Sequence, residues 1–271
     1  LIKNGIQGGT NWKPFWRSAE PKNFYDIIII GGGGHGLATA YYLAKNHGLK
    51  NIAVVEKGYL GGGNVGRNTT IVRANYLLDG NSQFFSHSLK LWEGMEQDLN
   101  FNTMMSQRGI LSLGHSDSQM DSLARRGNMM ISQGDDAELL SADDLLEYVP
   151  YVNQTDPRFP IYGGLLHRRG GTARHDAVAW GYARAANNLG VDIIQNCEVT
   201  GMIKNNNTLS GIQTTKGEIR ADKVGMAVAG RTSLVGDMAG LKLPIESHVL
   251  QAFVSEGLKP CVDCEISWGA E

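Results

Sequence analysis

The sequence predicts an α/β fold in which a Rossmann-like nucleotide-binding domain is interleaved with a second, α+β domain. Three observations lead to this prediction. A short apolar strand runs directly into a glycine-rich turn and a helix. A second apolar strand follows and ends in an acidic residue, about 20 residues after the last glycine of the turn. A group of short strands late in the chain leads to a further apolar strand that again ends in glycine.

The first strand covers residues 25–30, YDIIII, whose β-branched side chains are typical of a strand buried on both faces. The turn after it fits the spacing G-x-G-x-x-G at Gly31, Gly33 and Gly36. Gly31 allows the tight turn, Gly33 lets the backbone approach a pyrophosphate, and Gly36 lets the helix pack closely on the strand. We therefore expect a pyrophosphate at the N-terminus of the helix, where backbone N–H groups lack partners.

The helix is predicted over residues 37–47, with Gly48 as its C-terminal cap, and the second strand over residues 52–56. Glu56 ends that strand and can accept hydrogen bonds from ribose hydroxyls, while its charge argues against a 2′-phosphate. A glycine pattern alone is weak evidence, but here strand, helix, second strand and acid all occur at the required spacing. The sequence therefore predicts a dinucleotide cofactor.

The next segment, residues 57–70, combines glycines, amides, hydroxyls and one arginine. This composition suits a loop that wraps a diphosphate and a ribityl chain, and the alternative is a merely flexible loop. Residues 71–76 then place Arg73 inside an apolar segment. A guanidinium there needs an anionic partner, either in a structural ion pair or in the carboxylate of a substrate.

The middle of the chain alternates predicted helices and short strands. Helices are expected over residues 82–99 and 116–133, from Ser141 onward, and from about residue 176 to 189; Ser82 and Ser141 are the expected N-caps. Strands are expected over residues 109–114 and 163–167. His175 falls at a helix start and is flanked by arginines, and a single histidine there is ordinarily a surface or capping residue.

Strands are also expected over residues 191–195, 198–204, 209–214, 218–221, 223–230 and 243–254. The strand at residues 223–230 is expected to be buried and to return to the central sheet beside the cofactor. A nicotinamide-binding Rossmann domain would continue as successive βα units. The antiparallel strands before the returning strand favour an FAD-binding fold instead.

These elements group into an N-terminal arm and two discontinuous domains. The arm is residues 1–22, the FAD-binding domain is residues 23–80 and 160–235, and an incomplete substrate domain is residues 81–159 and 236–271. Trp12, Phe15 and Trp16 are expected to pin the arm, either on the chain's own body or against a partner. Because the chain lacks an initial methionine and stops where a strand begins, we expect a fragment truncated at its C-terminus.

Composition excludes several classes of function. Charged residues are 19% of the chain and the formal net charge is −2, which implies no general attraction to nucleic acid or membranes. No apolar run approaches the roughly 18 residues of a membrane span, and no signal peptide is visible, so a cytoplasmic location is expected. The chain has three cysteines, which argues against a disulfide framework. Cys261 and Cys264 form a C-x-x-C that we interpret as two incidental thiols, and no metal site is expected.

Four stretches carry a resemblance to a known family: residues 31–44, 66–76, 171–181 and 243–248. On these motifs the chain, from about Asn11 to its end, resembles the beta subunits of heterotetrameric sarcosine oxidases, within the D-amino-acid-oxidase-like flavoproteins. The stretch at residues 171–181 is the most specific, because these subunits carry a covalent FMN on the histidine that matches His175. The resemblance replaces the capping interpretation of His175, and Arg174 beside it is expected to bind the FMN.

The resemblance implies oxidative demethylation of sarcosine to glycine, with a hydride passing to FAD and electrons passing through FMN to oxygen to give hydrogen peroxide. The one-carbon unit would go to tetrahydrofolate or leave as formaldehyde, and the partners would be the alpha, gamma and delta subunits. Arg73 would hold the substrate carboxylate. Alternatives are a dimethylglycine- or proline-type amine dehydrogenase and a non-catalytic subunit that carries flavin. Substrate choice depends on residues that family members carry beyond position 271.

The glycine pattern, the loop and the resemblance together define the expected FAD site. Its predicted residues are Gly31, Gly33, Gly34, His35, Gly36, Glu56, Lys57, Gly63, Asn64, Arg67, Asn68, Thr69, Thr70, Val199, Ala229 and Gly230.

Overall fold

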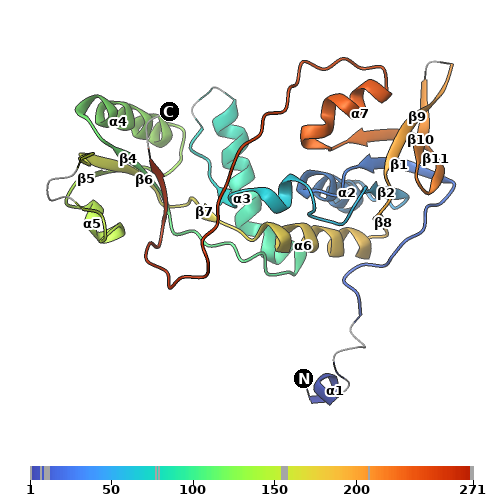
Figure 1. The fold of residues 1–271 in the computed structure, drawn as a ribbon, viewed down its shortest axis with the longest axis horizontal. Coiled ribbons are helices and arrows are strands. Elements are labelled where there is room, and N and C mark those ends of the chain that lie inside the picture. Colours follow the sequence, from blue (N-terminus) through green and yellow to red (C-terminus); the bar gives the residue numbers. More distant parts are fainter. Residues whose placement is uncertain are drawn as a thin grey trace. The chain divides into compact units, whose positions relative to one another are not determined.

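The computed structural model describes residues 2–6, 8, 13–76, 78, 80–153, 158–206 and 208–268. The chain forms two compact units, each assembled from two separate stretches (Figure 1). The first unit is Leu1–Asn68 with His175–Gln251, and the second is Thr69–Arg174 with Ala252–Glu271. The sequence predicted domain boundaries after residues 80, 159 and 235. That division into domains stays a prediction.

A six-stranded sheet with the order β8-β2-β1-β11-β10-β9 forms the centre of the first unit (Figure 1). Its strands are β1 (Phe24–Ile30), β2 (Ile52–Val55), β8 (Asp192–Ile194), β9 (Val199–Asn205), β10 (Thr208–Thr214) and β11 (Gly217–Met226). The four strands β8, β2, β1 and β11 are parallel, whereas β10 runs antiparallel to both β11 and β9. The predicted α/β sheet with an antiparallel extension is therefore present.

Two helices of the first unit pack against each other through aromatic side chains. They are α2 (Gly34–His47) and α6 (His175–Asn188), and the ring centroids of Tyr41 and Tyr182 lie 5.6 Å apart. Gly48 ends α2 with a φ of 68°, as expected for a left-handed cap. The helix begins at Gly34, three residues before the predicted start at residue 37, so the last part of the glycine turn is already helical.

The core of the first unit lies around β1 and β2. Tyr25, Ile28, Ala53 and Ile194 are fully buried, and all four residues of β2 are buried. Strands covered on both faces need apolar side chains at successive positions, which is the pattern that the sequence shows here.

Residues 13–22 carry no helix or strand and are held to the first unit by ionic contacts. The guanidinium of Arg17 and the Nζ of Lys22 both contact the carboxylate of Asp192, the latter at 2.8 Å. The hydroxyl of Tyr25 donates to the same carboxylate at 3.0 Å. That aromatic side chains pin this segment remains a prediction: Phe15 and Trp16 line a cavity of the first unit, and Trp12 lies outside the described residues. A short helix, α1 (Ile2–Ile6), precedes it.

The end of the first unit differs from the prediction. β11 is one continuous strand, because it pairs with β1 on one side and β10 on the other; Arg220, for example, lies opposite both Phe24 and Gly211. The strand predicted over residues 223–230 is therefore wrong in its bounds and burial: it ends at Met226 and its last residues are partly exposed. A 3-10 turn, η2 (Ala229–Arg231), and an unpredicted helix, α7 (Thr232–Met238), follow.

The strand predicted over residues 243–254 is absent from the structure, which shows extended chain without a ladder there. Val249 and Val254 are each 97% exposed, and Phe253 is 84% exposed. The apolar pattern suited a strand, but a strand forms only where a second strand supplies hydrogen bonds.

The second unit contains a four-stranded sheet with the order β12-β4-β6-β5. Its strands are β4 (Ile110–Gly114), β5 (Glu138–Ser141), β6 (Gly163–His167) and β12 (Glu265–Trp268). β4, β5 and β6 pair antiparallel, and β12 runs parallel to β4. Its long helices are α3 (Asn81–Leu99) and α4 (Asp117–Ser132). Side chains of β4 and β6, with Leu140 and Leu145, form its core.

Two predicted N-caps fail in the second unit. Ser82 is buried inside α3, which begins after Gly80 rather than at a serine cap. Ser141 ends the unpredicted strand β5, and only the four-residue helix α5 (Leu145–Tyr148) follows. The Oγ of Ser141 donates to Asp144 at 2.7 Å, so this serine stabilises the turn before α5. β3 (Ile71–Val72) and β7 (Gly171–Thr172) form a small antiparallel pair that was not predicted.

Among the helices in the described ranges, none is long and apolar enough to cross a membrane.

Candidate functional site

The glycine turn of the first unit contains two glycines that the fold itself requires. Gly31 has a φ of 108°, and a Cβ there would lie 2.3 Å from the carbonyl oxygen of Ala227. A Cβ at Gly36 would lie 1.9 Å from the carbonyl oxygen of Gly31. Gly31 is thus required for a left-handed backbone, and Gly36 is required for the close approach of helix and strand, as the motif predicts.

Gly33 is different, because neither its backbone conformation nor its protein neighbours exclude a side chain. It caps the N-terminus of α2 with φ −83° and ψ −179°, an extended conformation open to any residue. A Cβ there would meet no protein atom within 4 Å. Gly33 lines a large cavity of the first unit, so the space beside it is available to a ligand that approaches the backbone.

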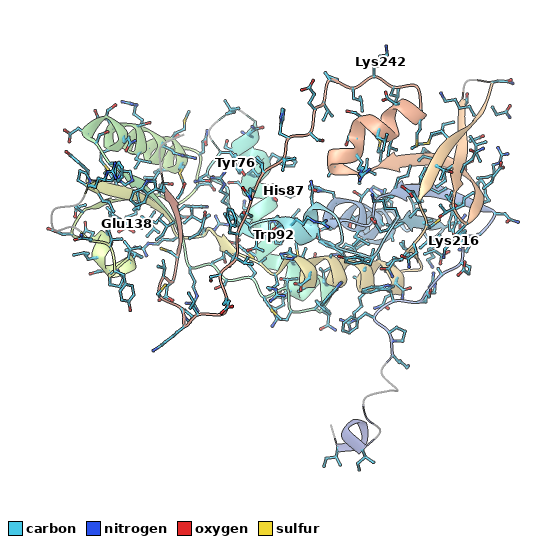
Figure 2. The ribbon with its side chains drawn as sticks, viewed as in Figure 1. Tyr76, His87, Trp92, Glu138, Lys216 and Lys242 are labelled. Atoms are coloured by element: carbon cyan, nitrogen blue, oxygen red, sulfur yellow. The ribbon has the colours of Figure 1, made fainter. Side chains whose placement is uncertain are left out.

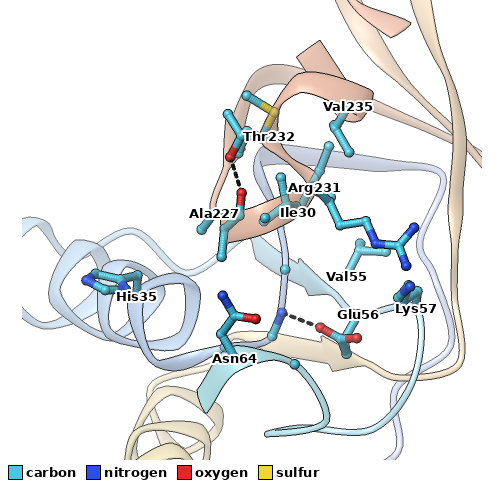
Figure 3. A pocket seen from close by; sticks show the side chains of 18 of the residues that line it. Ile30, His35, Val55, Glu56, Lys57, Asn64, Ala227, Arg231, Thr232 and Val235 are labelled. Atoms are coloured by element: carbon cyan, nitrogen blue, oxygen red, sulfur yellow. Dashed lines mark hydrogen bonds between the residues drawn. The ribbon is translucent and has the colours of Figure 1, made fainter. Parts of the chain in front are cut away.

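This first cavity has a volume of about 1020 Å³ and lies at the carboxyl ends of β1, β2 and β11. That edge of a parallel sheet is where α/β proteins bind ligands, and the volume suffices for a dinucleotide. Twelve of the predicted residues line it: Gly31, Gly33, Gly34, His35, Glu56, Lys57, Gly63, Asn64, Arg67, Val199, Ala229 and Gly230. Figure 3 shows several of them around the opening.

Four predicted residues do not line the first cavity. Gly36 is buried in α2. Asn68 follows the 3-10 turn η1 (Asn64–Arg67), and its amide donates to the carbonyl of Val65 at 2.6 Å. Thr69 and Thr70 belong to the second unit, where Thr69 lines a different cavity and the carbonyl of Thr70 accepts from the N–H of Ala173.

The structure adds residues to the first cavity that the sequence did not indicate. They include Gly32, Gly61, Gly62, Arg231, Thr232 and Val235. The last three belong to η2 and α7, and Figure 3 shows them on the side of the cavity opposite the loop. The sequence could not place them because α7 itself was not predicted.

Glu56 connects the glycine turn to the following loop. Its Oε2 accepts from the N–H of Gly32 at 2.8 Å (Figure 3). Its Oε1 accepts from the N–H of Gly58 at 3.0 Å. Each carboxylate oxygen keeps a second lone pair. Glu56 can therefore hold the two backbone segments in place and still accept a hydroxyl.

Cationic groups surround the rest of the first cavity. Lys57, Arg67 and Arg231 line it, and the N-terminus of α2 opens onto it. One Nη of Arg67 donates to the carbonyls of Gly62 and Gly63, which fixes the side chain across its own loop. These charges and the positive end of a helix suit a diphosphate.

A second cavity of about 590 Å³ also lies within the first unit. Its aromatic wall consists of Phe15, Trp16, Tyr59 and Trp180, and Gly61, Gly62 and Arg67 line both this cavity and the first. His175, the first residue of α6, lines it as well. The Nδ1 of His175 is buried and has no hydrogen-bond partner, so the histidine does not serve as a hydrogen-bonded cap. Aromatic faces of this kind suit a planar ring system.

A third cavity, of about 790 Å³, lies within the second unit and contains Arg73. The guanidinium of Arg73 lies 5.0 Å from the ring centre of Tyr76, which is labelled in Figure 2. Tyr76 in turn stacks on Phe85 of α3, with ring centroids 3.7 Å apart. Among the described residues no carboxylate forms an ion pair with Arg73. The structural ion pair considered from the sequence is therefore not found.

Arg174, which was expected to bind the FMN, is exposed and does not line the second cavity beside His175. Its backbone N–H donates to the carbonyl of Thr103.

Cys197, Cys261 and Cys264 are free thiols. Burial raises the pKa of the Cys264 thiol, which opposes its reactivity. In the part of the chain that the structure describes, no group of three or more His, Cys, Asp or Glu side chains could hold a metal ion.

The parallel sheet, the glycine turn, the acid at the end of β2 and the cavity above them define a dinucleotide-binding α/β protein. The sequence profile of the FAD dependent oxidoreductase family (DAO) matches residues 26–266. This chain belongs to that family, which confirms the predicted fold class and the FAD cofactor.

Curated relatives agree with this assignment. The chain is 60% identical to sarcosine oxidase subunit beta of Rhizobium meliloti (strain 1021) over 100% of its own length and 65% of that protein's. It is 48% identical to sarcosine oxidase subunit beta of Rhodobacter capsulatus over 97% of the chain and 64% of the relative. The chain thus spans slightly less than two thirds of these proteins.

Solved structures show the same fold. L-proline dehydrogenase from P. horikoshii matches with a TM-score of 0.75 and 26% identity, over 82% of this chain and 57% of that one. Glycine oxidase from Geobacillus kaustophilus matches with a TM-score of 0.76 over 91% of this chain and 66% of that one; at 19% identity it supports the fold alone.

Proposed function

We propose that this chain is the flavin-binding beta subunit of a heterotetrameric sarcosine oxidase, which demethylates sarcosine oxidatively to glycine. Its partners would be the alpha, gamma and delta subunits. The similarity to two sarcosine oxidase beta subunits supports this proposal, as does membership of the FAD dependent oxidoreductase family. The second cavity is the observation that carries it furthest, because it brings aromatic side chains together with His175, whose buried Nδ1 has no hydrogen-bond partner.

FAD fits the first cavity. Gly33 leaves its neighbourhood open, the N-terminus of α2 and nearby cations suit a diphosphate, and Glu56 is placed to accept a ribose hydroxyl. FMN fits the second cavity, where we assign its covalent attachment to a ring nitrogen of His175. When bound, FAD accepts a hydride from the N-methyl carbon, and FMN passes electrons to oxygen, giving hydrogen peroxide.

In this proposal Arg73 binds the substrate carboxylate. Its guanidinium is a planar fork of donors that matches a carboxylate, and stacking on Tyr76 fixes the orientation of that plane. The imine formed from sarcosine then loses its one-carbon unit as formaldehyde or to tetrahydrofolate. Dimethylglycine or proline dehydrogenation, and flavin carriage without catalysis, are the competing functions.

The test is His175→Ala in the assembled enzyme, with His248→Ala as the control because His248 is exposed and lines none of the three cavities. The parent and the control should give a fluorescent flavin band on a denaturing gel and a flavin-modified peptide by mass spectrometry. His175→Ala should lose both and retain FAD that acid releases. A flavin band that persists in His175→Ala would refute the attachment.

Anaerobic reduction of the parent enzyme separates the competing functions. Sarcosine should bleach the flavin faster than dimethylglycine or proline at equal concentration. A faster reaction with either competitor would assign a different amine substrate, and no reaction with any of them would identify a carrier.

A further inference from the structure

The third cavity contains an acidic side chain that the proposed function does not use. Glu265 is the first residue of β12 and lines the same cavity as Arg73. Its backbone is fixed, because its N–H donates to the carbonyl of Gly109 at 3.1 Å and its position pairs with Ile110 of β4. The carboxylate is therefore held by the sheet rather than by a mobile loop.

Two acceptor atoms in this cavity are buried and lack donors. The Oε2 of Glu265 and the Oδ1 of Asn75 have no hydrogen-bond partner, and the Asn75 side chain belongs to a residue only 3% exposed. A buried acceptor without a donor is costly, and it is rare in native structures unless a ligand supplies the donor. Both acceptors therefore indicate a ligand that carries N–H or O–H groups.

The charges around the cavity have opposite signs but do not neutralise one another directly. The positive charge of Arg73 acts on Glu265, yet no ion pair joins these two described residues. Arg126 donates to the backbone carbonyl of Asn75 at 3.2 Å, and Arg125 is exposed. A cation and an anion in one cavity, each able to bind a further group, match the two ends of an amino acid.

We propose that Glu265 binds the amine nitrogen of the amino-acid substrate whose carboxylate Arg73 holds, and that it accepts a proton from that nitrogen. In this step one N–H bond of the substrate ammonium breaks, an O–H bond forms on Glu265, and the electron pair stays on nitrogen. Asn75 supplies a second acceptor for the remaining N–H group. This assignment rests on the proposed function of the third cavity as the substrate site.

The electrostatic environment supports the proton transfer. Burial raises the pKa of Glu265, and the nearby charge of Arg73 lowers it by less. A carboxylate with a raised pKa is a stronger base than an exposed one. The other charged or titratable residues that line the cavity are Arg73, Tyr76, Arg125 and Arg126, and the arginines keep their charge at all working pH values.

The experiment compares two ligands that share a carboxylate but differ at the nitrogen. Sarcosine has the amine, whereas methoxyacetate replaces it with an ether oxygen that cannot donate. Glu265→Gln should weaken sarcosine binding by roughly 10- to 100-fold, measured by anaerobic stopped-flow reduction of the flavin, in line with a lost charged hydrogen bond. Methoxyacetate binding, measured by the change in flavin absorbance, should change by less than about 2-fold, because it never used the carboxylate of Glu265.

Three further variants complete the design. Arg73→Lys should weaken both ligands, and Glu256→Gln, an exposed glutamate of the same unit outside the cavity, should weaken neither. The reduction rate of the parent is expected to rise with pH, and this rise should flatten in Glu265→Gln. If that variant fails to fold, Glu265→Asp should fold and show a smaller, still sarcosine-selective loss.

Equal losses of both ligands in Glu265→Gln, or no loss of either, would overturn the amine-binding role. A parent enzyme that sarcosine does not reduce, but that binds methoxyacetate through Arg73, would instead overturn the proposed function.

Discussion

Gly33→Ala should weaken FAD binding without destabilising the protein that lacks FAD. The backbone at Gly33, φ −83° and ψ −179°, accommodates alanine, and the added Cβ meets no protein atom within 4 Å. Alanine also restricts the unfolded chain, which stabilises a protein by about 0.4–1 kcal/mol at a compatible site, and this offsets its poorer propensity for the N-cap position, where it costs about 0.5–2 kcal/mol relative to a good capping residue. The only atoms that the methyl group can displace are those of a ligand in the first cavity.

The loss of affinity follows from the hydrogen bonds that such a displacement breaks. A backbone N–H that donates to a charged phosphate contributes about 1.5–3 kcal/mol. Losing one such bond weakens FAD binding by roughly 10- to 150-fold, since 1.4 kcal/mol corresponds to a factor of ten. FAD affinity is therefore expected to fall while the stability of the FAD-free protein changes by no more than about 1 kcal/mol.

Gly36→Ala is the matched control. A Cβ at Gly36 would lie 1.9 Å from the carbonyl oxygen of Gly31, which is backbone and cannot rotate away. Helix α2 must then move from β1, and overpacking of this kind costs about 1–3 kcal/mol. This variant should be destabilised whether or not FAD is present.

Urea unfolding of the FAD-free proteins gives the free energy of unfolding, and titration with FAD gives the dissociation constant. FAD binding by Gly33→Ala at the parent's affinity would show that the diphosphate does not pass beside this glycine. A free energy of unfolding as low as that of Gly36→Ala would show that Gly33 serves the fold itself.

Two further predictions concern single carboxylates. Glu56→Gln should weaken FAD binding by about 1–3 kcal/mol in the same titration, because the amide replaces one acceptor with a donor that opposes the N–H of Gly32 or Gly58; unchanged affinity would contradict this role. Burial opposes ionisation of Asp192, but contacts such as that with Lys22 outweigh it and lower its pKa. This stabilisation is present above the pKa of an unfolded aspartate, near 3.9, and is lost as the pH falls through the lower pKa of the folded state. Asp192→Asn should therefore be less stable than the parent at pH 7. In urea unfolding, its free energy of unfolding should also fall less than the parent's on acidification.

The unit β1–α2–β2 could be predicted from the sequence because its signals are local. Each strand is a continuous apolar run, and Gly36 and Gly48 mark a close contact and a helix end that depend on residues nearby. The same holds for α4, where the Oγ of Ser116 accepts from the N–H of Gln119 at 3.3 Å. Local hydrogen bonds and short-range packing decide such elements.

Predictions failed where a distant segment decides the structure. β11 joins the two strands predicted over residues 218–221 and 223–230 into one strand, because β1, almost 200 residues earlier in the sequence, provides a partner along much of its length. Residues 243–254 have an equally good strand pattern but find no partner strand among the described residues. Strand propensity reports the ability to pair, whereas pairing itself depends on the rest of the fold.

The candidate site also contains residues that local patterns predict and residues that they do not. Residues near the glycine motif could be predicted, because the motif fixes their position relative to the cofactor. Arg231 and Glu265 were missed because each enters a cavity through an element that no local pattern connects to that cavity. His175 was predicted as the FMN attachment residue from the resemblance alone. The structure adds a physical feature that the sequence could not show, a buried ring nitrogen without a hydrogen-bond partner.

The loop that follows β2, together with η1, forms a wall of both cavities in the first unit, through Gly61, Gly62 and Arg67. This loop is tightly folded: a Cβ at Gly66 would lie 2.3 Å from the carbonyl oxygen of Gly61, and Arg67 is bonded back to the carbonyls of Gly62 and Gly63. Arg67 also brings the same positive charge to the edge of both cavities. In the proposed function this constrained wall would lie beside both flavins, so a substitution that alters the loop in one cavity is expected to alter the other.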